Sequence, residues 1–224
     1  ASTGVLYSDL NLGLNSFYLY EPLVNLDNGS FNWQEGTGNN RVSFLQGANN
    51  NLGFEKRVDI NFGLEALLWK SLSLEFNLFQ SDIKDKIIAL NTPYPSYYDD
   101  FKAFENFEAD RYRGLELGLN YSKAWGDFRL NIGGNFMLND NTALIRDENR
   151  QYAYQNREGQ SLNPIFGLQN LGFYNFLDFD GEGNVVSSLP TPEGNVQPGD
   201  IKYVNQNPQD DNEINNFDEV YLGR

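Results

Sequence analysis

The chain has 224 residues, with 31 acidic against 16 basic side chains and neither histidine nor cysteine. These counts exclude Ser-His-Asp and Cys-His catalysis, imidazole and thiolate metal ligands, and disulfide bonds. A net charge of −15 repels phosphate backbones and therefore argues against a nucleic-acid partner.

The first 51 residues carry only weak signals. No basic region followed by an apolar stretch opens the chain, so we expect no signal peptide, and no apolar run approaches the roughly 20 residues of a membrane helix. Leu10, Leu12 and Leu14 alternate with polar residues, which predicts a strand or the end of one. The stretch 25–51, rich in Asn and Gly, is predicted to be a loop.

Between Phe54 and Leu90 the apolar residues recur at every second position. This period of two is typical of strands with one apolar and one polar face. The apolar positions are Val58, Ile60, Phe62, Leu64, Ala66 and Leu68, then Leu72, Leu74, Phe76 and Leu78. Trp69-Lys70-Ser71 interrupts the pattern and predicts a very short turn, so the segment is predicted to be a hairpin.

A second hairpin is predicted after a long link, roughly 84–110. Its apolar positions are Leu115, Leu117, Leu119 and Tyr121, then Phe128, Leu130, Ile132, Phe136 and Leu138. The turn lies at 123–127, and each strand is expected to run for about ten residues, as in a tilted transmembrane β-strand of roughly 9–11 residues. Trp69 and Trp125 lie beside the short turns, where an interfacial aromatic girdle would place them.

No comparable strand is predicted for the last 85 residues, where most of the negative charge is concentrated. Segment 139–224 holds fourteen acids and five bases, whereas 54–90 holds six and five. Short turns on one side and long loops on the other are typical of outer-membrane barrels. The sequence therefore predicts an all-β fold, a partial transmembrane antiparallel β-barrel. Four or five strands cannot close such a barrel, so we expect residues 1–224 to be part of one larger barrel domain.

The residues from Asn50 onward contain several distinctive segments. The most specific is Pro198-Gly199-Asp200-Ile201-Lys202-Tyr203, followed by an Asn/Asp-rich stretch and Val220-Tyr221-Leu222-Gly223-Arg224. Others are Arg113-Gly114-Leu115-Glu116-Leu117 at a strand start, and the segments 50–56, 72–87 and 157–173. Together they resemble SusC/RagA-type TonB-dependent transporters, in which the segment around Arg113 is similar to a recurring strand start.

The resemblance implies TonB-dependent import of glycans or peptides across the outer membrane of a Gram-negative bacterium, with the loops extracellular. It also implies a SusD-like lipoprotein as partner, contact with outer-membrane lipid, and the TonB complex acting through a plug outside this segment. No catalytic residue is expected. The carboxylate pairs Asp99-Asp100 and Asp210-Asp211 invite a glycosidase interpretation, but no apolar pocket is evident to separate their pKa values.

The tail resembles an acidic calcium loop, in which oxygen side chains enclose a hard cation. The candidate Ca²⁺ ligands are Asn205, Asn207, Asp211 and Asp218. The family's first Asp is Asn205 here, the turn glycine is missing, and Pro208 with one extra residue disturbs the spacing. Two interpretations stay open, a weakened cation site and a solvated polar loop packed by Ile201, Ile214 and Tyr221.

The predicted loop 94–112 combines aromatic rings with carboxylates. Flat rings stack on sugar faces while carboxylates accept hydroxyl hydrogen bonds, and both also suit peptides. The candidate substrate-binding residues are Tyr97, Tyr98, Asp99, Asp100 and Phe101. The competing interpretation is packing of these rings within the loop or against a partner. Asp59, Asn61, Glu65, Glu75 and Asn120 are expected to line a hydrated interior.

Two other protein classes remain open. One is a secreted or surface β-sandwich that binds carbohydrate or protein, and the other is a barrel that moves polypeptide or has a structural role. Solubility of the intact parent would distinguish the sandwich from a barrel, and its binding partners would distinguish the two kinds of barrel.

Overall fold

The computed structural model describes residues 2–8, 19–26, 30–32, 38–40, 42–95, 101–207 and 212–224, with backbone alone at 7, 8, 30–32 and 38–40. The chain divides into two compact units, Ala1–Asn149 and Arg150–Arg224. The described residues form strands and short 3-10 turns without any α-helix, which confirms the all-β prediction. The assignment of both units to one barrel domain stays a prediction.

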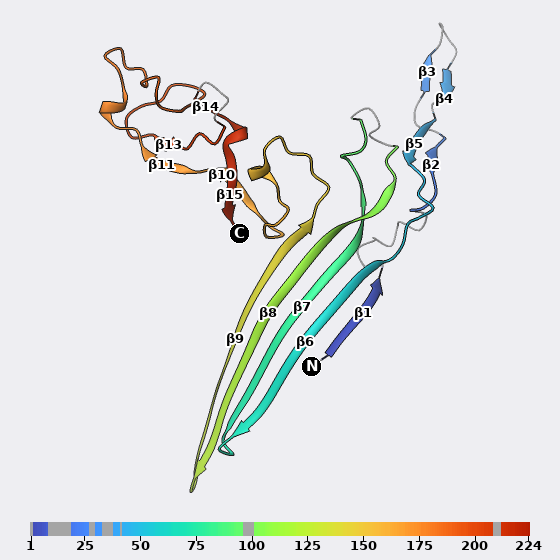
Figure 1. Ribbon diagram of the computed structural model, residues 1–224, viewed down its shortest axis with the longest axis vertical. Coiled ribbons are helices and arrows are strands. Elements are labelled where there is room, and N and C mark those ends of the chain that lie inside the picture. Colours follow the sequence, from blue (N-terminus) through green and yellow to red (C-terminus); the bar gives the residue numbers. More distant parts are fainter. Residues whose placement is uncertain are drawn as a thin grey trace. The chain divides into compact units, whose positions relative to one another are not determined.

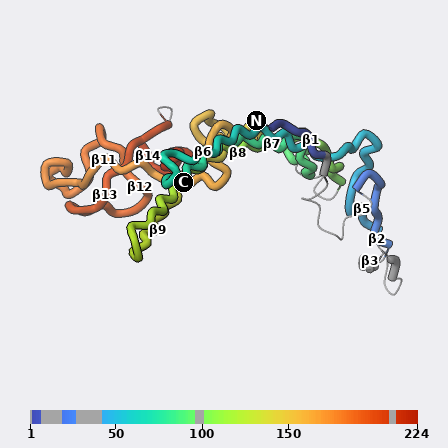
Figure 2. Tube along the Cα trace, turned by 90° about the horizontal axis from the view of Figure 1, so that it is seen from below, coloured from blue at the N-terminus to red at the C-terminus, as the bar shows by residue number. Residues whose placement is uncertain are grey.

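The first unit is built on a five-stranded antiparallel sheet in the order β1-β6-β7-β8-β9 (Figure 1). Its strands are β1 (Ser2–Ser8), β6 (Glu55–Leu68), β7 (Leu72–Ala89), β8 (Phe104–Trp125) and β9 (Phe128–Ile145). Seen from below, the sheet is a single curved layer (Figure 2). The β6–β7 and β8–β9 turns lie at the same end of the sheet, and the long β7–β8 loop lies at the other (Figure 1).

Two small hairpins lie in the stretch that the sequence predicted to be loop. They pair β2 (Leu23–Asn25) with β5 (Ser43–Gln46), and β3 (Ser30–Asn32) with β4 (Gly38–Asn40). The prediction that 25–51 is a loop was therefore wrong for these strands, because three- and four-residue strands are too short to show a period of two. The strand predicted around Leu10–Leu14 lies outside the described residues.

The second unit contains only short elements. They are β10 (Ile165–Leu168), β11 (Asn170–Phe173), β12 (Thr191–Pro192), β13 (Ile201–Tyr203), β14 (Glu213–Ile214) and β15 (Glu219–Gly223), with 3-10 turns η2 (Ala153–Gln155), η3 (Phe176–Asp178) and η4 (Asn216–Asp218). Three two-stranded pairs form within it, β10-β15, β11-β13 and β12-β14. The longest of these strands has five residues, which agrees with the absence of a predicted long strand in this region.

The long strands exceed the predicted ten residues, since β7 has 18 residues and β8 has 22. The predicted 84–110 link is correspondingly too long, because β7 continues to Ala89 and β8 begins at Phe104. Apolar alternation stops near Gln80, but backbone pairing continues past it with charged side chains on the strands. A register shift follows Ile83, and Asp85 there adopts a φ of 57°.

Gly114 is required where Phe79 of the neighbouring strand crosses it. A Cβ at Gly114 would lie 2.6 Å from the Leu138 carbonyl oxygen and 2.7 Å from the Phe79 ring. We expect Gly114→Ala to destabilise the sheet by about 1–3 kcal/mol, because such crowding forces backbone shifts. The check is the urea midpoint of the detergent-solubilised protein. Gly134→Ala is the matched control, since its Cβ would meet nothing within 4 Å, and an equal loss in both would refute this account.

Candidate functional site

One face of the long sheet carries a continuous band of large apolar side chains. The strand register places Leu64 beside Phe76, Phe76 beside Leu117, and Leu117 beside Phe136. The neighbouring cross-strand rows on this face repeat the arrangement, which confirms the predicted alternation of apolar and polar side chains. Side chains of this band that are 42–61 % exposed are Ile60, Phe62, Leu64, Leu78, Leu119, Ile132, Phe136 and Leu138. Soluble monomers rarely expose so large an apolar surface.

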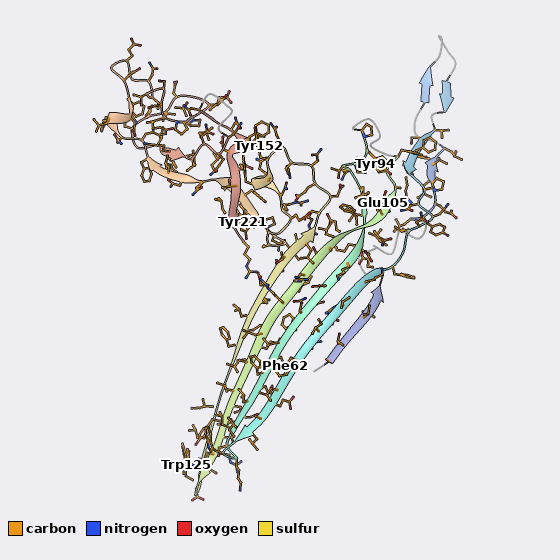
Figure 3. All side chains as sticks on the ribbon, viewed as in Figure 1. Phe62, Tyr94, Glu105, Trp125, Tyr152 and Tyr221 are labelled. Atoms are coloured by element: carbon orange, nitrogen blue, oxygen red, sulfur yellow. The ribbon has the colours of Figure 1, made fainter. Side chains whose placement is uncertain are left out.

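The band ends at tryptophans on one side, beside the short turns. Trp69 lies in the β6–β7 turn and is 84 % exposed. Trp125, the last residue of β8, lies at the end of the sheet that carries the short turns (Figure 3). Its ring stacks on that of Phe128, with 6.1 Å between the ring centroids. Lys123 lies over the Trp125 ring, with its Nζ 5.4 Å from the centroid. Rings with polar atoms and cations at this position match the anchors found at membrane interfaces.

The band ends at ion pairs on the other side. On the same face, Arg113 donates to Asp140 at 2.9 Å, directly beyond the row of Leu115. One row further, Arg111 donates twice to Asp82, at 2.7 and 2.9 Å. The sequence interpretation missed both pairs. Counting outward from the Gly126-Asp127 turn would have placed Arg113 opposite Asp140.

The opposite face of the sheet is polar and rich in glycine. The register places Asp59, Asn61, Glu65, Glu75 and Asn120 on it, as predicted. Glu65 lies directly opposite Glu75, and both are exposed. Like charges in that position repel, so they are tolerated where water screens them. This face is therefore suited to a hydrated interior.

A buried charge cluster lies beyond the band, at the ends of β7, β8 and β9 that are far from the short turns. The Asp110 carboxylate is 4 % exposed and accepts from Lys86 at 2.7 Å and from Arg146. Glu108 lies 3.6 Å from Arg146. Asp110 falls within the predicted aromatic loop 94–112, but the structure places its carboxylate in this ion-pair cluster.

Of the five candidate substrate-binding residues, the structure describes Phe101 alone. Tyr97, Tyr98, Asp99 and Asp100 lie outside the described residues. Phe101 packs edge-on against Phe44 of β5, with ring centroids 4.9 Å apart. Phe101 is 40 % exposed and Phe44 51 %. Cargo contact by this set stays a prediction.

The base of that loop is tied to the β2–β5 hairpin. The Gly47 amide donates to the Lys102 carbonyl at 3.0 Å, and the Asn49 side-chain amide donates to the Phe104 carbonyl at 2.7 Å. The buried Gln46 side chain of β5 donates to the carbonyls of Leu19 and Glu21, at 2.8 and 3.0 Å. The described residues at the end of this loop, Lys102 and Phe104, are thus hydrogen-bonded to the segment that follows β5.

Of the four candidate Ca²⁺ ligands, three are described and Asp211 is outside the described residues. The fully buried Asp218 carboxylate accepts from the backbone amides of Gln206, Asn207 and Asn215, at 2.7, 3.1 and 2.9 Å. Amides point at its oxygens, so a cation would have to compete with them. Ca²⁺ binding stays a prediction; a Ca²⁺-dependent rise in Tm that Asp218→Asn removes would support it, and an unchanged Tm would contradict it.

Asp178 makes the second unit sensitive to acid. A hydrogen bond from Lys202 at 2.7 Å, and then the Asn175 backbone amide, lower the pKa of Asp178 below its ordinary value of 3.8. Its contribution to stability is therefore present above pH 3.8 and is lost as the pH falls through the lower folded-state pKa. We expect the hydrogen-exchange protection factors of residues 171–203, corrected for the intrinsic exchange rate at each pH, to fall as the pH is lowered below 3.8. Lys202→Met should reduce this fall, and an identical pH profile of the protection factors would contradict the assignment.

Among the described residues, no helix is long and apolar enough to cross a bilayer. No family model and no curated protein matches the chain. Solved structures of a RagAB peptide importer do match. The chain is 22 % identical to its "closed-closed" state, with TM-score 0.52, covering 75 % of this chain and 20 % of that one. The "open-open" state gives 22 % identity, TM-score 0.54, and coverage of 76 % and 18 %.

A third solved structure, of the RagAB peptide transporter, is 20 % identical with TM-score 0.51, covering 84 % of this chain and 21 % of that one. The chain thus spans about a fifth of the length of the solved chains it matches. At this identity the likeness is one of fold. It is a likeness between this chain and a segment of the peptide-importer chains.

Proposed function

We propose that this chain forms part of a TonB-dependent outer-membrane importer of the SusC/RagA type. It would take up peptides or glycans together with a SusD-like lipoprotein, with the long loops extracellular. The observation that carries this proposal is the exposed apolar band on four antiparallel strands, bounded by tryptophans and ion pairs. The likeness to peptide-importer chains supports the same class of protein.

The height of the band fits a bilayer. Ten residue steps separate Leu115 from Trp125, and at about 3.3 Å per residue they extend about 33 Å along the strand. A strand tilt of about 40° reduces this to about 25 Å, which is the height of the apolar belt on outer-membrane barrels. The Arg113–Asp140 and Arg111–Asp82 pairs then lie at the height where the lipid headgroups would begin.

The sheet requires further strands. Among the described residues, nothing pairs with the outer edge of β9, and β1 covers β6 only along Glu55–Asn61. Backbone groups on an open edge cannot remain unpaired in lipid, so we propose that strands outside this sequence close the barrel. The polar face would then line its interior, and TonB would act through a plug that also lies outside this sequence.

We propose a passage role rather than catalysis for the side chains here. The buried carboxylates of Asp110 and Asp218 are held by cations and by backbone amides, respectively. Tyr97, Tyr98, Asp99, Asp100 and Phe101 are proposed to contact cargo at the entrance. Tyr97→Ala with Tyr98→Ala should lower uptake of the cargo without lowering the amount of protein in the membrane.

The alternative, a surface β-sandwich, is less well supported. A sandwich buries the apolar face of one sheet against a second sheet about 10 Å away. In the described part of the first unit, no element covers the band, whose side chains remain about half exposed.

Fractionation of cells producing the full-length parent tests the proposal. We expect the parent in the outer-membrane fraction, extracted by detergent alone, and uptake of labelled peptide or glycan that depends on the proton-motive force. A parent that is soluble without detergent would contradict the proposal.

A further inference from the structure

The end of β11 and the residues that follow it present large apolar side chains to solvent. Phe173 is 63 % exposed, Phe176 is 85 % exposed and Leu177 is 91 % exposed. Phe176 and Leu177 form the first two positions of η3. Single exposed apolar residues are common on protein surfaces, but three within five positions are not scattered.

The ribbon formed by β11 and β13 turns apolar side chains towards solvent and polar ones towards the interior, the reverse of an ordinary protein surface. Phe173 pairs with Ile201, and both are exposed. The next residues, Tyr174 and Lys202, point inward. Tyr174 is 2 % exposed and donates its hydroxyl to the Pro190 carbonyl, while the Lys202 Nζ lies 5.3 Å from the Tyr174 ring centroid. The buried side of this ribbon therefore carries a cation and its outer side is apolar.

The exposed tip is held in a fixed conformation. Asn175 accepts from the Leu177 amide at 2.8 Å, and the Asn175 amide donates to Asp178 at 2.9 Å, forming a reciprocal capping box. Lys202 then fixes Asp178 at 2.7 Å. Phe176 and Leu177 are thus presented by a braced turn, and a preorganised apolar group loses little conformational entropy on binding.

The same turn occurs elsewhere in the unit with its apolar side chain partly covered. In η4, Asn215 accepts from the Phe217 amide at 2.8 Å, and the Asn215 amide donates to Asp218 at 2.9 Å. Phe217, at the position equivalent to Leu177, packs edge-on against Tyr152 with ring centroids 6.0 Å apart. Phe217 is 40 % exposed, less than half the value for Leu177. The turn itself therefore does not require an apolar residue as exposed as Leu177.

Charge identifies the kind of partner. Residues 150–224 contain eleven acids and four bases, a net charge of −7, and Asp178, Asp180 and Glu182 follow directly after the tip. This field repels anionic lipid headgroups and also a second copy of the same surface. It favours a protein whose apolar pocket is surrounded by Lys and Arg.

We propose that Phe176 and Leu177 are the anchor by which this unit docks into an apolar, basic-rimmed pocket of a second protein, with Phe173 and Ile201 beside it. The identification of that protein as the importer's lipoprotein subunit rests on the proposed function. Apolar anchors held in well-packed pockets dominate the binding energy of interfaces.

Residues 1–224 contain no cysteine, so a single cysteine introduced in this segment of the full-length protein can be labelled specifically once any cysteine elsewhere in the protein has been replaced. Leu177→Cys is labelled with a polarity-sensitive fluorophore. The matched control is Ile165→Cys, because the wild-type side chain at position 165 is also exposed, at 55 %. Purified lipoprotein subunit, vesicles of phosphatidylglycerol with lipopolysaccharide, and increasing concentrations of the protein itself are added separately. We expect a saturable blue shift at position 177 with the lipoprotein subunit alone. A shift with vesicles or with self-concentration, or no shift with the subunit, would overturn the proposal.

Affinity provides the second measurement. Phe176→Ser with Leu177→Ser should weaken binding of the lipoprotein subunit at least about 30-fold, whereas Ile165→Ser should change it less than about 3-fold. The replaced side chains are 85–91 % exposed, so their loss should leave the fold intact, which hydrogen exchange verifies. Equal affinities would overturn the anchor role. Peptide uptake by cells reports separately on the proposed function, since uptake with an unshifted fluorophore would refute the anchor alone.

Discussion

Replacing Phe136 by arginine is expected to destabilise the membrane-inserted protein by about 2–4 kcal/mol, because that is the cost of a cation at the middle of the lipid-facing surface of a barrel. Phe136 lies in the central row of the apolar band, beside Leu117. The side chain is 56 % exposed in the structure, so in a water-soluble protein the same change would be nearly neutral. The measurement is reversible denaturant unfolding in lipid vesicles.

Met137→Arg supplies a matched control. Met137 is adjacent in the chain and 57 % exposed, but it lies on the opposite face, where Glu116 is its cross-strand neighbour. An arginine there would meet water and an opposite charge, so we expect a change within about 0.5 kcal/mol. Equal effects of the two substitutions would show that the faces do not differ in environment.

Asp218→Ala is expected to destabilise the second unit by at least about 3 kcal/mol. The substitution leaves the amides of Gln206, Asn207 and Asn215 without their acceptor, and each buried unsatisfied donor costs about 1–3 kcal/mol. Hydrogen exchange of residues 203–223 in the full-length protein measures the loss. Glu219→Ala, exposed and adjacent, should change exchange little, and equal acceleration in both variants would contradict the anchoring role.

The alternating faces of the two long hairpins could be predicted from the sequence, because a period of two with short turns leaves a single register. Rows such as Leu64, Phe76, Leu117 and Phe136 follow from that register. The strand ends could not be predicted from apolar alternation, because beyond Gln80 the side chains change from apolar residues to ion pairs such as Arg111–Asp82 while backbone pairing continues.

The roles of residues in the loops were harder to predict from the sequence. Asp218 was grouped with cation ligands because acidic loops that bind Ca²⁺ and acidic loops that cap turns share a composition. The distinguishing signal was spacing, since Asn-x-x-Asp occurs at Asn175–Asp178 and at Asn215–Asp218 and forms a capping box in both places. The difference in exposure between Leu177 and Phe217 could not be predicted, because the capping motif is the same in both turns and the packing of Tyr152 on Phe217 is a tertiary contact.

Lipid contact along β9 tests the central claim most directly. Single cysteines at positions 135 to 138 of the full-length protein, which has none in the segment described, are labelled with a fluorophore in vesicles whose lipid chains carry bromine. Bromine quenches only fluorophores that touch the acyl chains. We predict strong quenching at 136 and 138 and little at 135 and 137. Equal quenching at all four positions, or none, would contradict the assignment of the apolar band to the bilayer.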